Sequence, residues 1–322
     1  MGDPAGIGPE VSLKAISTPA VRRAITPLLV GDPGVWWETA RRLRLDLQFT
    51  EAPRPPAGVV TLVPTSSLPE RWRAAGKPRS RAHAAACGAA AHAAIIEAVA
   101  LVRQGRAGGI VTAPISKAHL VAAGNDFPGH TELLAELCGG VPVRMMMVGG
   151  SLRVVLVTIH MALRDVPRRL TATSVFDTIA ITVAALRQRF RIARPHIAVT
   201  GLNPHAGEDG LFGDEDIRII APAVRRARRR GIDAVGPLAA DGVFPYAERG
   251  DYDAVIAMYH DQGLAPFKLL HFADGVNCTL GLPFVRTSPD HGTAFDIAGR
   301  GKADASSMAA ALLLASKLAS RP

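Results

Sequence analysis

The sequence predicts an α/β protein in which short buried strands alternate with helices. Ala254–Met258 has the length and apolar composition of a strand that is buried on both faces. The segment 83–104 reads as a long Ala-rich helix that ends at Gly105, and Ile110–Thr112 reads as the strand after it. Because helices separate the strands, we expect the strands to run parallel in a sheet covered by helices.

Size and composition bound the class of protein. The chain has 322 residues and is 48% hydrophobic, which is enough for one large domain or two smaller ones. No apolar run is long enough to suggest a membrane span, and the beginning does not resemble a signal peptide. The three cysteines (Cys87, Cys138, Cys278) lie far apart and lack zinc-ligand spacing. A reduced cytoplasmic protein is therefore expected.

The basic charge favours an anionic small molecule over nucleic acid. The net charge is +9, and the densest basic run, Arg225–Arg230, lies near the end of one predicted helix. No interleaved aromatic residues and no nucleic-acid motif accompany it. We expect a solvated Arg-rich surface that attracts an anionic metabolite.

The first part of the chain begins with a Gly- and Pro-rich turn over residues 2–10, followed by a helix from Val11 to Ile16. Such a turn usually follows a strand, so its position at the start suggests that a first strand is missing. Two interpretations stay open: a loop whose backbone approaches an anion, or a tight strand-to-helix connection. Leu28–Gly31 and Val59–Val63 are predicted strands.

Two further candidate residues, Lys117 and His130, lie beside predicted elements. Ile110–Thr112 leads into Lys117, and Thr131-Glu132 opens a helix over Leu133–Leu137 just after His130. A His and a Thr at a helix N-terminus can hold an anion, although Thr131 can equally serve as an N-cap.

The second half repeats the strand–helix alternation. The predicted elements are strand Leu152–Ile159, helix Ser174–Phe190, strand His196–Leu202, helix Glu215–Arg230 capped by Asp214, a loop over 237–246 that carries Asp241, and a final helix over Ala305–Leu318.

Three of these strands end close to a histidine. Leu152–Ile159 precedes His160, His196–Leu202 precedes His205 by three residues, and Ala254–Met258 precedes His260. Because parallel strands end at one edge of a sheet, the three imidazoles are expected to approach one another. Three neutral imidazoles suit Zn²⁺ or another borderline divalent ion with one position left for substrate. Asp165 and Asp261 are candidates for orienting these rings, or else simple loop caps.

Five motifs carry a resemblance that covers nearly the whole chain. In order they are G-D-P-A-G-I-G-P-E, P-G-H-T-E, G-L-N-P-H-A-G-E, M-Y-H-D-Q-G and R-T-S-P-D-H-G-T-A. The sequence closely resembles the 4-hydroxythreonine-4-phosphate dehydrogenase family of vitamin B6 biosynthesis. The resemblance implies two α/β/α subdomains with a cleft between them, as in isocitrate and isopropylmalate dehydrogenases. It also implies a homodimer that shares its active site. We expect residues 1–125 with 280–322 to form the cofactor-side subdomain. Residues 126–279 would then form the metal, substrate and dimerisation subdomain.

The resemblance also implies roles for individual residues. His160, His205 and His260 match the divalent-metal ligands, and in the family one of the three comes from the partner subunit. The residues that match substrate-binding positions are His130, Thr131, Lys268, Asn277 and Arg286. Lys268 and Arg286 are natural phosphate partners, one as a point charge and the other as a fork.

A Gly-containing segment near the end resembles the adenosine-binding loop of isopropylmalate dehydrogenases. Its candidate cofactor-binding residues are His291, Gly292, Thr293, Ala294 and Asp296. Asp296 would repel a 2′-phosphate, so NAD is expected in preference to NADP, although a simple turn into the last helix is the alternative.

The implied reaction is metal-assisted oxidation of a phosphorylated four-carbon hydroxy acid, followed by loss of CO₂. Asp241, Asp261 and Lys117 are unranked candidates for the proton acceptor, and Zn²⁺, Co²⁺, Mg²⁺ and Mn²⁺ are all open as the metal. Three other functions stay open. They are oxidation of threonate or erythronate 4-phosphate, a metal-dependent lyase or aldolase without nicotinamide, and a non-catalytic metal-binding protein.

Overall fold

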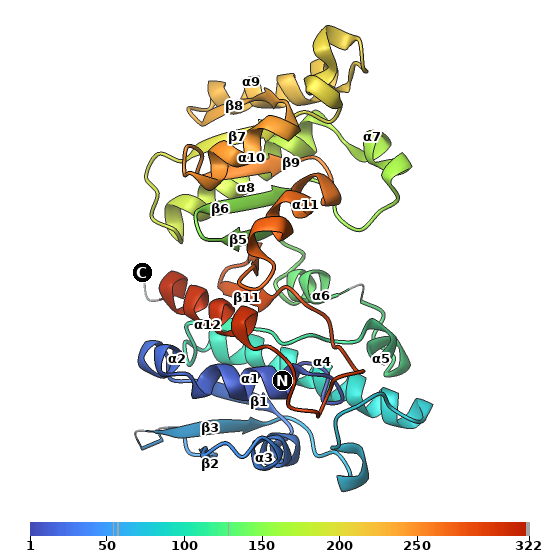
Figure 1. Ribbon diagram of the computed structural model, residues 1–322, viewed down its shortest axis with the longest axis vertical. Helices are drawn as coiled ribbons and strands as arrows, with labels where there is room; N and C mark the ends of the chain where they lie inside the picture. Colours follow the sequence, from blue (N-terminus) through green and yellow to red (C-terminus); the bar gives the residue numbers. More distant parts are fainter. Residues whose placement is uncertain (54, 57, 128, 320–322) are drawn as a thin grey trace. The chain divides into compact units, whose positions relative to one another are not determined.

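The computed structural model describes residues 1–53, 55–56, 58–127 and 129–319 and has two compact units (Figure 1). The first comprises Met1–Val141 and Leu282–Pro322, and the second comprises Pro142–Gly281. Residues 126–141, which contain a helix at the P-G-H-T-E motif, belong to the first unit and not to the second.

The first unit is an α/β unit with two groups of parallel strands. Its elements are α1 Gly8–Ser17, α2 Pro19–Ala24, β1 Leu28–Gly31, α3 Pro33–Arg42, β2 Gln48–Thr50, β3 Val59–Pro64, η1 Glu70–Trp72, α4 Arg81–Arg103, β4 Gly109–Val111, α5 Lys117–Ala122, α6 His130–Leu137, β11 Val285–Pro289 and α12 Ser306–Ala319. The strand order β1-β3-β2 is parallel throughout, and β4 pairs in parallel with β11. Helix α12 packs on β11 and β4, while α4 packs on β1 and α5.

Local sequence signals set several of these helix starts. Asp32 caps α3 by accepting a hydrogen bond from the Val35 backbone N–H at 3.1 Å, and Ser80 caps α4 through the His83 N–H at 3.1 Å. Helix α4 is long and apolar enough to cross a membrane, as is a bent pair of helices at 163–188, by length and composition alone. The core helix of a water-soluble domain meets the same criteria, so this observation assigns no membrane span.

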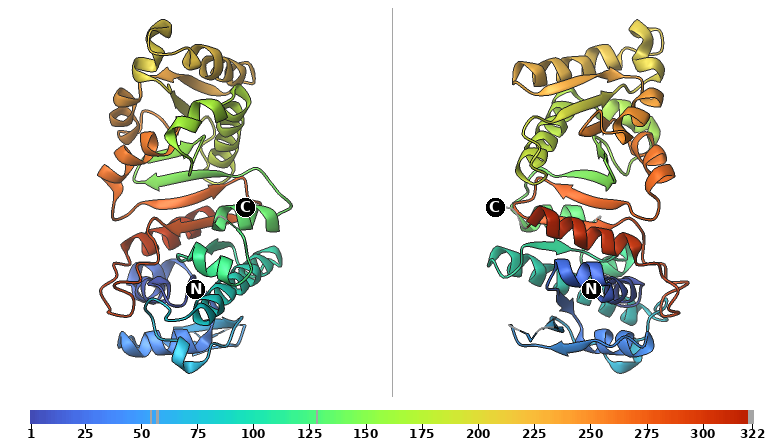
Figure 2. Two further views of the ribbon diagram at one scale, coloured as in Figure 1. Left: turned by 90° about the vertical axis from the view of Figure 1, so that its right-hand side faces the viewer. Right: turned by 60° about the vertical axis from the view of Figure 1, so that its left-hand side comes forward.

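The second unit is a twisted six-stranded sheet with helices on both faces (Figure 2). Its elements are β5 Arg144–Gly149, β6 Leu152–Leu156, η2 Leu163–Asp165, α7 Val166–Arg169, α8 Ala172–Gln188, β7 His196–Thr200, η3 Pro204–Gly210, η4 Asp216–Ile220, α9 Ala221–Arg229, β8 Asp233–Leu238, α10 Ala240–Glu248, β9 Ala254–Ala257, α11 His260–His271 and β10 Val276–Leu280. The strand order is β10-β5-β6-β9-β7-β8.

The sheet of the second unit is mixed, contrary to the expectation of a purely parallel one. Strand β5 runs antiparallel to both β6 and β10, whereas β6, β9, β7 and β8 are parallel. The tight Gly149–Leu152 connection explains the reversal, because two strands joined by so short a turn must run antiparallel.

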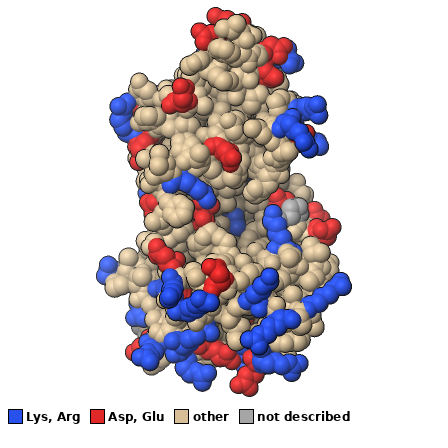
Figure 3. Space-filling view, turned by 45° about the vertical axis from the view of Figure 1, so that its right-hand side comes forward, with Lys and Arg blue, Asp and Glu red and all other residues tan. Residues whose placement is uncertain are grey.

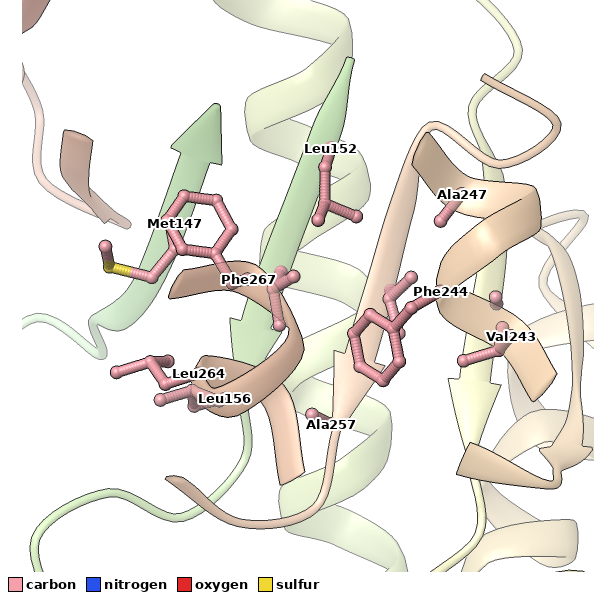
Figure 4. Packing of buried hydrophobic residues seen from close by; sticks show 12 residues of the cluster. Met147, Leu152, Leu156, Val243, Phe244, Ala247, Ala257, Leu264 and Phe267 are labelled. Carbon is pink, nitrogen blue, oxygen red and sulfur yellow. The ribbon is translucent and has the colours of Figure 1, made fainter. Parts of the chain in front are cut away.

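One core cluster of the second unit lies between the sheet and helices α10 and α11 (Figure 4). Leu152, Val154 and Leu156 alternate along β6 and project to one face, where Phe244 of α10 and Phe267 of α11 pack over them. This packing fixes α11, and therefore its first residue, against the sheet.

Two local predictions were wrong. Segment 237–246 is not a loop, because Asp241 lies in the first turn of α10. The predicted helix Glu215–Arg230 starts with a π-helical turn at Asp216, and Asp214 binds the Arg218 guanidinium at 2.6 Å without capping the helix. On the face shown in Figure 3, Lys and Arg side chains gather over the lower part, where they adjoin one another and some Asp and Glu side chains.

Candidate active site

Three adjacent strands of the second unit carry the predicted metal-binding histidines. Strands β6, β9 and β7 are neighbours and parallel, so their carboxyl ends lie at one edge of the sheet. His160 follows β6, His260 begins α11 directly after β9, and His205 lies in the turn after β7. The expectation that these three strand ends share one edge is confirmed.

The structure brings two of the three imidazoles together. The ring centroids of His160 and His260 are 5.6 Å apart, with the ring planes inclined at 43°. Nδ1 of His260 lies 2.7 Å from Oδ1 of Asp261, which fixes the ring orientation and directs Nε2 to any ligand that the ring holds. Neutral imidazole nitrogens so arranged suit a borderline divalent cation.

Gln262 holds the strand ends behind this pair in place. Its Oε1 accepts hydrogen bonds from the Met258 N–H at 2.7 Å and the Thr200 hydroxyl at 2.8 Å, and its Nε2 donates to the Gly201 carbonyl at 2.7 Å. One side chain thus ties the end of β9 to the end of β7. Sequence reasoning missed this role, although Gln262 follows His260 and Asp261 within one motif.

His205 lies apart from the other two rings. It begins a run of left-handed residues, and its ring packs 6.2 Å from Phe212. The buried Asp216 carboxylate fixes this segment by accepting hydrogen bonds from the Leu202 N–H at 2.7 Å and the Asn203 side chain at 2.9 Å. Among the residues that the structure describes, no three His, Cys, Asp or Glu side chains come close enough to hold a metal. One chain therefore assembles two of the three predicted ligands.

The other predicted residues of the second unit are spread over four elements. Lys268 lies on α11 and shares a helix face with Asp261, seven residues earlier. Asn277 lies on β10, and its Oδ1 is buried without a hydrogen-bond partner among the described residues. Asp241 is exposed on α10, and Asp165 ends the 3₁₀ turn η2.

In the first unit, a buried basic group forms around His130 and Arg286. Arg286 is 3% exposed on β11 and donates to the Thr112 hydroxyl at 2.6 Å. His130 is the first residue of α6, and its Nε2 is buried without a hydrogen-bond partner among the described residues. Burial, followed by the Arg286 guanidinium, holds the pKa of the His130 imidazole well below its ordinary value. A neutral imidazole beside a fixed guanidinium suits an anionic ligand with a hydrogen-bonding group.

The helix start at His130 differs in detail from the prediction. The N-cap residue of α6 is Gly129, which has no side chain to accept a hydrogen bond, so Thr131 lies inside the first turn and does not cap the helix. A Cβ atom at Gly129 would lie 3.9 Å from Cε of Lys117. The candidate base Lys117 therefore lies next to the turn that carries His130.

His130 and Thr112 also line a cavity of about 440 Å³ within the first unit. The β1 residues Leu28, Leu29 and Val30 and the whole of β4 line it as well. The Met1 amino group donates to the Val30 carbonyl at 3.1 Å, and burial lowers the pKa of that amino group to about 5.

The predicted cofactor segment forms an irregular loop between β11 and α12. Nδ1 of His291 lies 3.1 Å from the Gly292 carbonyl oxygen, and its Nε2 is buried without a hydrogen-bond partner among the described residues. Ala294 has a left-handed φ of 39°, and its carbonyl accepts the Ile297 and Ala298 N–H groups. Asp296 is exposed.

The Gly-rich turn at the start of the chain is packed against protein backbone. A Cβ on Gly2 would lie 2.5 Å from the Pro114 carbonyl oxygen, and one on Gly6 would lie 3.0 Å from the Thr293 carbonyl oxygen. Of the two interpretations of residues 2–10, this geometry favours the tight connection, because the glycines allow close backbone approach within the protein.

The fold and these residues define an α/β enzyme with imidazoles at the carboxyl ends of its strands and a buried basic group. The family model described as "Pyridoxal phosphate biosynthetic protein PdxA" matches residues 23–315. A 4-hydroxythreonine-4-phosphate dehydrogenase from Geobacter metallireducens is 52% identical over 99% of this chain and 94% of its own length. One from Desulfosudis oleivorans is 48% identical over 98% and 93%. The chain belongs to the 4-hydroxythreonine-4-phosphate dehydrogenase family of vitamin B6 synthesis.

Solved structures agree with this assignment. The crystal structure of 4-hydroxythreonine-4-phosphate dehydrogenase from Klebsiella pneumoniae has a TM-score of 0.87 and 41% identity, covering 99% of this chain and 96% of that one. A terephthalate 1,2-cis-dihydrodiol dehydrogenase from Burkholderia xenovorans has a TM-score of 0.68 and 32% identity, covering 98% and 96%. The α/β fold and the enzyme class, a dehydrogenase, are thereby confirmed.

Proposed function

We propose that this protein oxidises the 3-hydroxyl of 4-phosphooxy-L-threonine with NAD, assisted by a divalent metal. Loss of CO₂ from the 3-keto acid then gives 3-amino-1-hydroxyacetone 1-phosphate. The names of the relatives and the family model support the substrate. A reduced cytoplasmic location is part of this proposal.

The observation that carries the proposal is the pairing of His160 and His260 at two adjacent strand ends. Asp261 fixes one of the two rings, and the imidazoles suit two ligand positions of Zn²⁺ or Co²⁺. Mg²⁺ and Mn²⁺, which are harder ions, are the alternatives. A bound cation would supply Lewis acidity to the substrate hydroxyl. The third ligand is proposed to be His205 of a second copy, since His205 lies outside the pair within one chain. The enzyme would then be a homodimer with a shared site.

The phosphate and carboxylate of the substrate are assigned to Lys268, Arg286 and the His130–Thr131 turn. Buried Arg286 is held by Thr112 and has a planar fork that suits a phosphate or carboxylate. The buried polar atoms of His130 and Asn277 lack protein partners among the described residues, and buried polar atoms of this kind usually have a ligand or water as partner.

The nicotinamide cofactor is assigned to the loop of His291, Gly292, Thr293, Ala294 and Asp296. Exposed Asp296 would accept ribose hydroxyls and repel a 2′-phosphate, so NAD should be preferred. If NADP supported the higher kcat/KM, this role of Asp296 would be wrong.

The proton acceptor is proposed to be one of three residues, Asp241, Asp261 or Lys117. Of these, Asp261 is already bound to His260, and Lys117 lies beside the His130 turn.

A substrate panel tests the proposal. Metal-loaded protein is mixed with NAD and 4-phosphooxy-L-threonine, and NADH absorbance and released CO₂ are measured. Threonate and erythronate 4-phosphate serve as matched substrates that differ only near C2. The proposal expects the highest kcat/KM for 4-phosphooxy-L-threonine. A higher value for either sugar-acid phosphate would assign the enzyme to that substrate. Turnover of a sugar phosphate without nicotinamide would instead support the lyase.

The dihydrodiol dehydrogenase similarity suggests one more comparison. That relative acts on an unphosphorylated diol by its name, and its match to this chain is weaker in both TM-score and identity. A dihydrodiol should therefore be a poor substrate here, because it lacks the phosphate that Arg286 and Lys268 are proposed to bind.

A further inference from the structure

The loop over residues 290–304 is anchored to the protein mainly through the Gly-rich turn and helix α1. The Thr293 carbonyl accepts the Ile7 N–H at 2.9 Å, and Gly6 lies directly against Thr293. These contacts hold the middle of the loop. The turn is therefore packed against the proposed cofactor loop in the same unit.

An ion pair on α1 between buried Glu10 and half-buried Lys14 holds the far end of the loop. The Glu10 carboxylate, 1% exposed, accepts the Ala303 N–H at 2.9 Å and the Gly301 N–H at 3.2 Å. Lys14 Nζ donates to Glu10 at 2.8 Å and to the Gly301 and Ala303 carbonyls, each at 2.8 Å. The two side chains together satisfy both backbone groups of both loop residues. A carboxylate this deeply buried is retained only where such partners compensate for lost hydration.

A second buried pair supports the ring of Phe295. Nδ1 of His119 lies 2.6 Å from Oδ2 of Asp3, and the His119 ring lies 5.2 Å from that of Phe295. Asp3 is itself fixed, because its N–H donates to the Pro114 carbonyl and its Oδ1 accepts the Ala5 N–H. Phe295 is the residue before Asp296, so this pair sets the position of the residue proposed to read the ribose.

We propose that Glu10 and Lys14, together with Gly6 and the Asp3–His119 pair, are positioning residues for the nicotinamide cofactor. They hold the 290–304 loop in the shape that binds the cofactor without touching the cofactor themselves. The inference rests on the proposed function, since it takes the loop to be the cofactor site. It gives a role to two residues of the first motif of the sequence, Gly6 and Glu10, which contact this loop.

Two variants test the proposal without removing a large core side chain. Lys14→Met removes three hydrogen bonds and leaves the aliphatic stem. Gly6→Ala pushes a methyl group against Thr293, and Gly6 has no positive φ that would oppose alanine. The matched controls are Lys317→Met, an exposed lysine on α12, and Gly242→Ala, where a Cβ meets nothing within 4 Å.

Three measurements are made on each full-length protein: hydrogen exchange of residues 290–304, the Kd for NAD, and KM for NAD beside kcat. Lys14→Met and Gly6→Ala are expected to speed exchange in the loop and raise the Kd and KM for NAD about tenfold, since charged hydrogen bonds are lost or displaced. The kcat at saturating NAD should stay near that of the parent. Lys14→Arg should restore most of the affinity, and both control variants should match the parent.

The outcomes separate this inference from the proposed function. A parent protein that binds NAD, with both variants binding equally well and exchanging equally slowly, overturns the positioning role alone. A parent protein that binds no nicotinamide overturns the proposed function and this inference with it. A loss of kcat without a change in KM would place these residues in the chemical step and would also overturn the positioning role.

Discussion

Two histidines of the first unit differ in their surroundings from the three at the strand ends of the second unit, which also contains the buried His271 paired with Glu248 and Asp274. In the first unit, His119 is buried against Asp3. The His130 ring has a lowered pKa and a buried Nε2 that has no hydrogen-bond partner among the described residues. In the second unit, His160 and His205 are exposed and His260 is half-buried, all just after parallel strands. The difference shows that burial and position on the sheet, more than residue type, decide whether an imidazole orders the protein or remains accessible to a metal.

The largest expected effect comes from removing a ring of the exposed pair. His160→Ala or His260→Ala should lower kcat/KM on the order of 10³-fold, because the loss of a Lewis acid removes several kcal/mol of transition-state stabilisation. The melting temperature should change little, since neither ring belongs to the core. His92→Ala on α4 is the control. Activity retained in either variant would remove the basis for a metal at this edge.

A smaller effect is expected from the residue that orients His260. Asp261→Asn keeps the size of the side chain but weakens its hydrogen bond to Nδ1. The apparent affinity for Zn²⁺ or Co²⁺, measured by titration of the metal-free protein, should fall roughly 10- to 100-fold. Saturating metal should restore most of the activity. A loss of kcat that excess metal leaves unchanged would instead support Asp261 as the proton acceptor.

The smallest expected effect concerns the buried histidine of the first unit. The pKa of His130 is lower in the folded protein than the ordinary value of 6.5, so the unfolded chain binds more protons as the pH falls below that value. His130 should therefore cost stability as the pH falls from 6.5 towards its folded pKa. Chemical denaturation at pH 7.5 and 5.5 should show a smaller loss for His130→Gln than for the parent. Equal losses would mean that His130 is protonated without penalty.

The features that the sequence predicted correctly are those that follow from a regular hydrophobic pattern, namely the buried strands and their order. Apolar runs gave β1, β3, β7 and β9 within a few residues, and the order of strands and helices placed three histidines at one edge of the sheet. Hydrophobic pattern is a local property, and the strands that it identifies have little freedom in a buried sheet.

What the sequence did not predict depends on contacts distant along the chain. Strand β5 reverses direction because of a tight glycine-containing turn, and Asp241 is helical although it was expected in a loop. The roles of Gln262 and Thr112 were not predicted. Gln262 bridges the ends of two strands and Thr112 accepts a hydrogen bond from a guanidinium, and no local sequence pattern indicates either contact. The left-handed backbone that carries His205 was not predicted either, because four of its five residues have ordinary side chains.

The segment that carries His205 is wound with the opposite hand to an ordinary helix. Five successive residues, His205–Asp209, have φ between 42° and 83°, and four of them are not glycine. Each such L-residue stores about 1–2 kcal/mol of steric energy relative to a right-handed turn. The Asp216 carboxylate holds the chain just before this segment, where it accepts hydrogen bonds from the Leu202 and Asn203 N–H groups. The position of the His205 ring therefore depends on a strained local backbone and not on the regular pairing of β7 with its neighbours.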